Sequence, residues 1–176
     1  MTVLKEDQFC YIRNPKDEHG QNQLGKKVLF EGPKSFFLQP GEEIDGGIQK
    51  VYILGEDEAL LLRAEETHTE ADGTVRNAVD RWMVKGPSRY TPPVQVILLE
   101  KRTTIPLDTN EGIYVRDNRD GSIRSVCGKT YMLLAHEELW PMPLDPQVEE
   151  LIGFKNGVRR DQTRLVTFKC NYNNAV

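Results

Sequence analysis

The sequence predicts an all-β fold of small antiparallel β-sheet repeats that follow one another as an elongated stave. Two observations support this prediction. A Leu and an Arg stand nine positions apart three times, with a polar or acidic link after the Leu: Leu4 and Arg13, Leu54 and Arg63, Leu107 and Arg116. A glycine turn follows each Arg after a loop of variable length, at Gly32, Gly86 and Gly128. Constant elements separated by variable loops are typical of a repeat array.

The repeated pattern divides the chain into five segments. They are a first repeat at 1–48, a second repeat at 49–101, a third repeat at 102–152, a linker at 153–164 and the start of a further, truncated repeat at 165–176. Repeats of about fifty residues are marginally stable alone, so neighbouring repeats are expected to cover each other's faces. Because the last copy of the pattern stops before its Arg, we expect the chain to be a fragment of a longer repeat protein.

Each repeat is expected to contain a strand at its Val-x-Leu start, a strand that ends at the Arg, and one strand on each side of the glycine turn. Loops with Asp17, His19-Gly20, Asp72-Gly73 and Asp120-Gly121 are expected to join the middle two strands as hairpins. Alternation gives the Arg-ending strand one apolar core face, formed by Cys10 and Ile12, Leu60 and Leu62, and Ile113 and Val115. The other face carries Tyr11, Leu61 and Tyr114 and is expected to pack against a neighbour.

Two further local structures are predicted. In Gly32-Pro33 and Gly86-Pro87, the glycine is expected to adopt an unusual backbone conformation, and the proline fixes φ. A short helix is expected near 146–152, with Asp145 as the N-cap and Pro146 at the first helical position.

Composition excludes several classes of partner. The net charge is −4 and the basic residues are scattered, so the segment carries no electrostatic footprint for nucleic acid or for a membrane surface. The longest mostly apolar run, Val94 to Leu99, is too short to cross a bilayer. Cys10, Cys127 and Cys170 are interpreted as small buried hydrophobic residues in a reducing compartment, which indicates the cytoplasm.

The search for chemistry yields no catalytic, cofactor-binding or metal-binding residue, so the protein is not predicted to be an enzyme. His136-Glu137-Glu138 begins like a zinc-protease helix, but the second His is missing and a strand-end loop is expected. Asp117 to Gly121 faintly resembles a calcium loop, yet Arg119 stands where a ligand is needed, and a hairpin tip is expected instead.

The recurring Arg13, Arg63 and Arg116 allow two interpretations. They could form one anion-binding site per repeat, or ion pairs that tie adjacent repeats or adjacent chains together. The acidic links beside them favour ion pairs, and their role is otherwise left open.

Several stretches resemble repeats of the major vault protein family. They are Gln23 to Lys27, Lys34 to Glu42, Gly47 to Leu54, Ala59 to Ala64, Ile105 to Val115 and Thr130 to Leu133. The resemblance extends over nearly the whole chain and is weakest at 65–78 and 153–162. It implies no catalytic residues and no cofactor. It implies that many identical staves stand side by side and enclose the hollow vault ribonucleoprotein particle in the cytoplasm, with a nuclear location left open.

The resemblance also implies partners beyond identical chains. Vault RNA, the vault-associated poly(ADP-ribose) polymerase and other vault proteins cannot be assigned to any residue of this segment. Two hypotheses from different classes therefore follow. The chain is either a structural module of a self-assembling shell, or a non-polymerising β-repeat scaffold that binds proteins or small anions through its loops.

Overall fold

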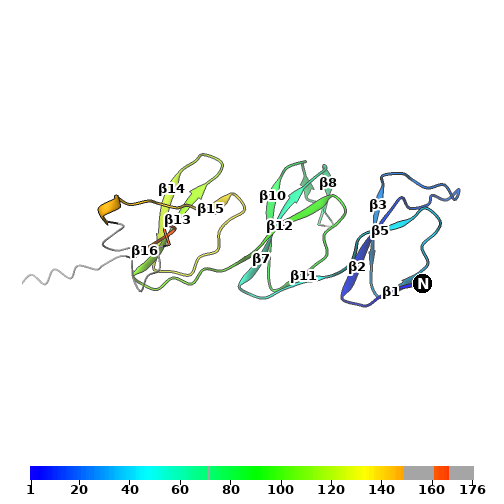
Figure 1. Cartoon of the computed structure of the whole chain (residues 1–176), viewed down its shortest axis with the longest axis horizontal. Coiled ribbons are helices and arrows are strands. Elements are labelled where there is room, and N and C mark those ends of the chain that lie inside the picture. The colour runs from blue at the N-terminus through cyan, green and yellow to red at the C-terminus, as the bar shows by residue number, and fades with distance from the viewer. Residues whose placement is uncertain (71, 149–160, 167–176) are drawn as a thin grey trace, which may run out of the picture. The chain divides into compact units, whose positions relative to one another are not determined.

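The computed structural model describes residues 1–70, 72–148 and 161–166, and it confirms the all-β fold (Figure 1). Small antiparallel sheets account for almost all of the regular structure. The chain divides into two compact units, Met1–Lys101 and Arg102–Val176. The five predicted segments remain a prediction, and their names are kept below as labels for residue ranges.

The first repeat contains five strands. They are β1 (Thr2–Leu4), β2 (Gln8–Arg13), β3 (Lys27–Glu31), β4 (Lys34–Phe36) and β5 (Glu43–Lys50). Sequence reasoning predicted the first four and missed β5. The central strand β2 pairs with β3 on one side and with β5 on the other, while β1 pairs with β4. The β2–β5 register shifts between Phe9 and Tyr11, where β5 contains Gly46 and Gly47 in positive-φ conformations. This glycine pair interrupted the strand pattern in the sequence and concealed β5.

The second repeat has the same plan with one added hairpin. Its strands are β6 (Tyr52–Leu54), β7 (Glu58–Ala64), β8 (His68–Thr69), β9 (Val75–Arg76), β10 (Arg81–Lys85), β11 (Ser88–Tyr90) and β12 (Val96–Thr103). The order β10-β7-β12 repeats the order β3-β2-β5, and β6 pairs with β11. The small β8–β9 hairpin lies in the long loop between β7 and β10.

The third repeat splits its last strand into two pieces. Its strands are β13 (Glu111–Asp117), β14 (Ile123–Cys127) and β15 (Glu137–Leu139), and β16 (Arg164–Val166) completes the sheet. Glu138 of β15 lies opposite Arg116, as Glu43 of β5 lies opposite Arg13. Since β16 pairs with the other end of β13, β15 and β16 together take the place of β5.

Of the predicted linker and further repeat, only residues 161–166 lie within the described part, and Arg164–Val166 forms β16. The predicted helix begins as expected, with helical residues at 146–148. The Gln147 backbone N–H donates to Asp145 Oδ1 at 2.9 Å, so Asp145 caps this end. The remainder of that prediction lies outside the described residues.

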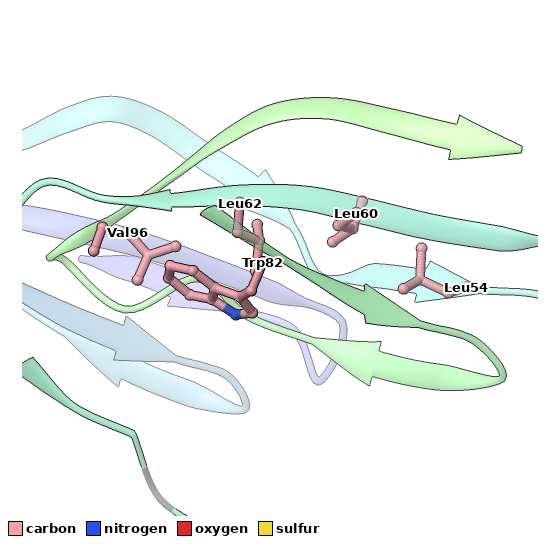
Figure 2. Packing of buried hydrophobic residues seen from close by; sticks show 6 residues of the cluster. Leu54, Leu60, Leu62, Trp82 and Val96 are labelled. Carbon is pink, nitrogen blue, oxygen red and sulfur yellow. The ribbon is translucent and has the colours of Figure 1, made fainter. Parts of the chain in front are cut away.

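The hydrophobic core is divided into one cluster per repeat. The residues predicted for the core face of the Arg-ending strands, Cys10, Ile12, Leu60, Leu62, Ile113 and Val115, are all buried. In the second repeat Trp82 lies beside Val96 and Leu62 in the same cluster (Figure 2). Hairpins join β2 to β3, β7 to β10 and β13 to β14, as predicted.

The explanation offered for the Gly-Pro turns was wrong in part. Of the three turn glycines, only Gly128, which is not followed by proline, has a positive φ, at 67°; Gly32 and Gly86 do not. A Cβ at Gly32 would instead overlap the Lys5 carbonyl oxygen, and one at Gly86 would overlap the Gly55 carbonyl oxygen. Glycine is needed at these two turns because another backbone segment passes too close for any side chain. The Gly32–Pro33 and Gly86–Pro87 peptide bonds are cis.

The cysteine prediction holds for Cys10 and fails for Cys127. Cys10 is buried, and burial raises the pKa of its thiol. Cys127 is exposed because it follows the buried Val126 on β14, and alternation along a strand turns it to the other face. Both are free thiols, and Cys170 lies outside the described residues. Within the described residues, no helix is long and apolar enough to cross a membrane.

Candidate functional site

The recurring Arg of the first repeat is held by an aspartate on the strand that sequence reasoning missed. Arg13 Nη2 donates to Asp45 Oδ1 at 2.5 Å, and Lys27 Nζ lies 2.6 Å from Asp45 Oδ2. The hydrogen bond from Lys27 is the main cause that lowers the pKa of Asp45. One carboxylate of β5 therefore joins cations from β2 and β3 across the sheet.

The other two arginines differ from the first. Arg116 lies 3.8 Å from Glu138 Oε1, and its guanidinium carbon is 4.5 Å from the centre of the Trp140 ring. Arg63 has no ion-pair partner among the described residues, and it lies opposite Arg81 in the strand register. The sequence thus identified a structural position whose chemistry is not constant from repeat to repeat.

The ion pairs of Arg13 and Arg116 are made with Asp45 and Glu138, which lie outside the acidic links, contrary to the expectation. Each link closes a tight turn in which a side chain three residues on accepts a hydrogen bond from the backbone. The Gly55 N–H donates to Glu58 Oε2 at 3.0 Å, and the Lys5 N–H donates to Gln8 Oε1 at 2.9 Å. The ion pairs of Arg13 and Arg116 therefore lie within a repeat and do not connect one repeat to the next.

On the second face of β2, Tyr11 packs against the second repeat, as predicted. The Tyr11 hydroxyl donates to the Pro92 carbonyl at 2.9 Å, and burial raises the pKa of Tyr11 to about 12. The Val51 N–H donates to the Asp7 carbonyl at 2.8 Å, and the Arg89 guanidinium donates to the Glu6 carbonyl of the same link. Two of these three contacts between the repeats therefore use backbone carbonyls of the link, at Glu6 and Asp7, and not its acidic side chains.

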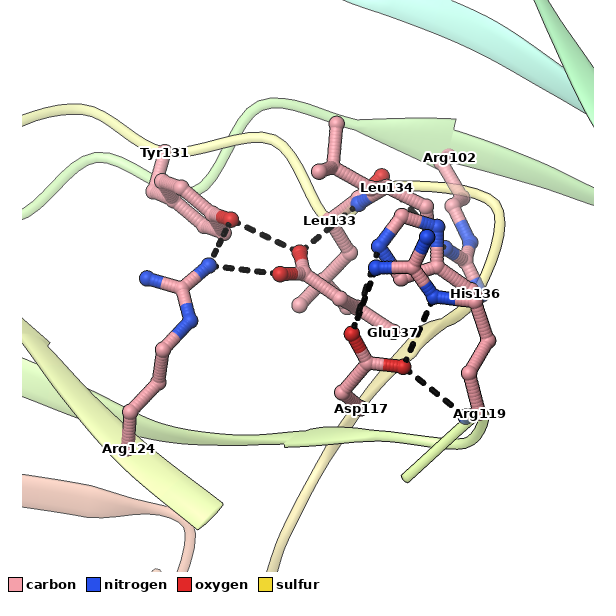
Figure 3. Close-up of polar contacts among 9 residues, drawn as sticks. All are labelled: Arg102, Asp117, Arg119, Arg124, Tyr131, Leu133, Leu134, His136 and Glu137. Atoms are coloured by element: carbon pink, nitrogen blue, oxygen red, sulfur yellow. Dashed lines mark hydrogen bonds and ion pairs between the residues drawn. The ribbon is translucent and has the colours of Figure 1, made fainter. Parts of the chain in front are cut away.

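The third repeat contains a buried carboxylate that sequence reasoning did not single out (Figure 3). Glu137 is 3% exposed and accepts hydrogen bonds from Arg124 Nη2 at 2.5 Å, the Tyr131 hydroxyl at 2.7 Å and the Leu134 N–H at 3.0 Å. Burial alone would raise the pKa of Glu137, but these hydrogen bonds and the Arg124 charge lower it below its usual value. The stretch expected to be a strand-end loop instead places Glu137 at the start of β15. Both oxygens of the Glu137 carboxylate are therefore hydrogen-bonded within the third repeat.

The acidic hairpin after β13 uses its carboxylates locally. Arg119 donates to both oxygens of Asp117, and the Ser122 N–H donates to Asp120 Oδ1 at 2.8 Å. The hydrogen bonds from Arg119 lower the pKa of Asp117 to about 2. His136 Nε2 lies 3.5 Å from Asp117 Oδ2. Across the described stretches of chain, no three His, Cys, Asp or Glu side chains gather closely enough to hold a metal ion.

A cleft of about 620 Å³ lies beside the β8–β9 hairpin, lined among others by His68, Glu70, Asp72 and Tyr90. Beside it, Arg76 stacks on Trp82 and lies 3.3 Å from Glu70. Among the described residues, His68 Nε2, Arg76 Nε and Trp82 Nε1 are the buried side-chain atoms without a hydrogen-bond partner. With two carboxylates against one guanidinium, the cleft is a poor site for a small anion.

Comparisons with known proteins agree along the whole chain. Models of the Major Vault Protein repeat domain match residues 1–48, 52–93 and 104–163. The chain is 45% identical over 193 residues to the major vault protein of Strongylocentrotus purpuratus, covering 100% of this chain and 22% of the relative. It is 47% identical over 187 residues to the major vault protein beta of Dictyostelium discoideum, covering 99% and 22%. It is 45% identical over 199 residues to the major vault protein of Gallus gallus, covering 100% and 23%. The chain therefore spans less than a quarter of the length of these relatives.

Proposed function

Because the chain belongs to the family of major vault protein repeat domains, we propose that it forms part of the wall of the hollow vault particle, by associating side by side with identical chains. The observation that carries this proposal is the identity of 45–47% to three major vault proteins over essentially the whole chain. The family is structural, and the role proposed here requires no catalysis.

The fold is suited to such a role. In the first repeat, one face of β2 belongs to the core and the opposite face is covered by the second repeat through Tyr11 and Pro92. A repeat stacked in this way has its sheet edges left for contacts with other chains. Stacked repeats gain stability from their neighbours, so a wall can be built from units of marginal individual stability.

We place the particle in the cytoplasm. Identical chains are the partners that the proposal requires. The vault-associated poly(ADP-ribose) polymerase and other vault proteins remain predicted partners of the whole particle.

The alternative is a non-polymerising scaffold that binds other molecules through its loops. The cleft beside the β8–β9 hairpin is the observation that favours this alternative, and its two carboxylates disfavour a small anion as the ligand. The two functions differ in whether identical chains associate.

A segment exchange tests the proposed function. The 176 residues replace the matching 22% of the Strongylocentrotus purpuratus relative, and the product is imaged by negative-stain electron microscopy. Closed hollow particles are expected. Folded chains that never assemble, beside an unaltered relative that does, would favour the scaffold and contradict the proposal.

A further inference from the structure

The recurring Arg has different neighbours on its own sheet in each of the three repeats. In the first repeat, Lys27 of β3 lies opposite Arg13 of β2, and the Asp45 carboxylate of β5 contacts both cations. In the third repeat, Glu138 of β15 lies opposite Arg116 of β13 and pairs with it. Each of these two arginines therefore has a carboxylate partner inside its own sheet.

The second repeat places two arginines beside each other without such a partner. Arg63 of β7 lies directly opposite Arg81 of β10, so both side chains are on one face of the sheet. Neither takes part in an ion pair among the described residues. Like charges directly opposite each other on two strands are unfavourable, so an anion between them would stabilise the pair.

The turns before the edge strands show which residues of the first and second repeats correspond. Glu42 and Val96 each donate their backbone N–H to the carbonyl three residues earlier. Two residues farther along the chain, Ile44 and Leu98 each pack against the core cluster of their own repeat. The residues that follow these turns on β5 and β12 are therefore equivalent.

This correspondence places apolar residues where the first repeat has acids. Ile97 is the counterpart of Glu43, and Leu99 is the counterpart of Asp45. Because Leu98 packs against the core, alternation along β12 turns Ile97 and Leu99 to the face that carries the two arginines. The second repeat therefore keeps two opposed cations and lacks the carboxylate that joins them in the first repeat.

The acids nearest in sequence do not replace that carboxylate. Asp80 precedes Arg81, but its Oδ2 accepts the Asn77 N–H at 2.8 Å. Glu65 follows Arg63 by two positions, but it lines a cleft together with lysines of the first repeat. Since Arg63 is half-buried and Arg81 is exposed, an acceptor from another molecule can reach both guanidinium groups.

We propose that Arg63 and Arg81 form a binding site for a carboxylate of another molecule, carried on an apolar stem that lies over Ile97 and Leu99. The first repeat shows the chemistry, because Asp45 places one carboxylate oxygen on each of two opposed cations. Arginine is suited to this role, since its planar guanidinium group donates two parallel hydrogen bonds to a carboxylate. The site does not depend on the proposed function, because it is a property of the single chain.

A simpler interpretation is a pair of hydrated arginines that bind nothing. Water and salt screen exposed charges, so two neighbouring cations do not by themselves require a ligand. The two interpretations differ in whether a carboxylate binds these two arginines together and leaves the other recurring arginines unaffected.

Nuclear magnetic resonance of the ¹⁵N-labelled 176-residue chain tests the site through the arginine Nε–H signals. The probe is sodium hexanoate, with sodium chloride at equal ionic strength as the reference. The signals of Arg63 and Arg81 should shift saturably with one shared affinity. Those of Arg13 and Arg116 should shift far less, because both already have carboxylate partners. Shifts of equal size at all four arginines, or no saturable shift at Arg63 and Arg81, would overturn the proposal.

Two variants supply or withhold the missing carboxylate inside the chain. Leu99 is 38% exposed, so replacing it should leave the fold intact. Leu99→Asp should bind hexanoate about fivefold more weakly than the neutral Leu99→Asn, as expected for an exposed ion pair of about 1 kcal/mol. Equal affinities in these two variants would contradict a site that lacks its carboxylate.

Removal of either arginine tests whether both belong to one site. Arg63→Gln and Arg81→Gln should each weaken hexanoate binding about fivefold. The control is Lys85→Gln, which removes an exposed cation at the other end of β10 and should leave the affinity unchanged. Unchanged binding in either arginine variant would show that the two do not act together.

Further probes identify the source of the carboxylate. The peptide acetyl-Leu-Glu-Leu-amide represents an acidic side chain of a protein, and the same peptide with Gln is its control. Tighter binding of the Glu peptide than of hexanoate would assign the site to an acidic segment of a protein partner, and equal or weaker binding would assign it to a free organic acid. Saturation by inorganic phosphate without any binding of hexanoate or the Glu peptide would overturn the assignment to a carboxylate.

Discussion

Arg124 and Glu137 form an ion pair in the third repeat at the two positions that Trp82 and Val96 occupy in the second, with Glu137 buried and the Arg124 side chain half exposed. Arg124 lies opposite Val115 as Trp82 lies opposite Leu62. Glu137 and Val96 each close the turn that begins the edge strand, with their N–H groups donating to the carbonyls of Leu134 and Pro93. The same two positions are thus held by an apolar pair in one copy and by an ion pair in the next.

Removing Glu137 while Arg124 and the other donors remain should destabilise the third repeat. Glu137→Ala leaves the Tyr131 hydroxyl and the Leu134 N–H without an acceptor, so we expect a loss of about 1–3 kcal/mol in the free energy of unfolding. Urea denaturation measures it. The matched control is Glu138→Ala on the same strand, which should cost less than about 0.5 kcal/mol. An equal loss in both variants would contradict the role given to Glu137.

Introducing the apolar pair of the second repeat into the third repeat should restore part of the free energy of unfolding lost in the single variants. The double variant Arg124→Trp with Glu137→Val replaces the ion pair, in which only the carboxylate is buried, by the apolar pair of the second repeat. Apolar residues can often replace charges that a fold removes from water. We expect each single change to destabilise the chain and the double change to be more stable than the sum of the two predicts. Strict additivity in a double-mutant cycle would show that the two positions do not share one site.

The third repeat should lose stability in acid. Hydrogen bonds and the Arg124 charge outweigh burial and lower the pKa of Glu137 below 4.5. A carboxylate with a lowered pKa stabilises the fold above its unfolded pKa, and this stabilisation disappears as the pH falls through the folded pKa. The urea midpoint should therefore drop below about pH 4.5, and the drop should be smaller in Glu137→Gln. An identical pH profile in that variant would contradict this assignment.

Damage to the core of one repeat should reach its neighbour. Leu62 is fully buried, so Leu62→Ala should cost about 2–5 kcal/mol. Because Tyr11 of the first repeat is covered by Pro92 of the second, hydrogen exchange should accelerate in β2 as well. Ile53→Ala, at a side chain that is 69% exposed, is the control and should leave β2 unchanged. Protection lost only within residues 50–100 would contradict the stacking of repeats.

The recurring arginines should separate into two groups. Arg13→Glu places a carboxylate beside Asp45, and Arg116→Glu places one beside Glu138, so both should destabilise their own repeats. Arg63→Glu removes no ion pair among the described residues and should leave folding unchanged. Circular dichroism during thermal unfolding measures folding, and electron microscopy of the segment-exchanged relative measures assembly. Lost assembly in Arg63→Glu alone would identify Arg63 as a contact between chains.

The sequence by itself determined the class of fold, the strand that contains each recurring Arg, the hairpins and the buried face of Leu60 and Leu62, whereas the strand expected at Leu107 is replaced by an isolated bridge at Ile105. These features follow from alternation and turn chemistry, which act over a few neighbouring residues. The sequence was also sufficient to recognise the resemblance to the family, because the motifs and their order along the chain can be identified without a structure.

Only the tertiary structure decided which groups meet. Arg13 finds Asp45 thirty-two positions away because β5 pairs with β2, and Gly46 and Gly47 concealed that strand. Glu137 becomes buried because the turn into β15 brings it under Arg124. The partner of a charge is fixed by the register between distant strands, whereas the sequence pattern records only whether a side chain faces the core.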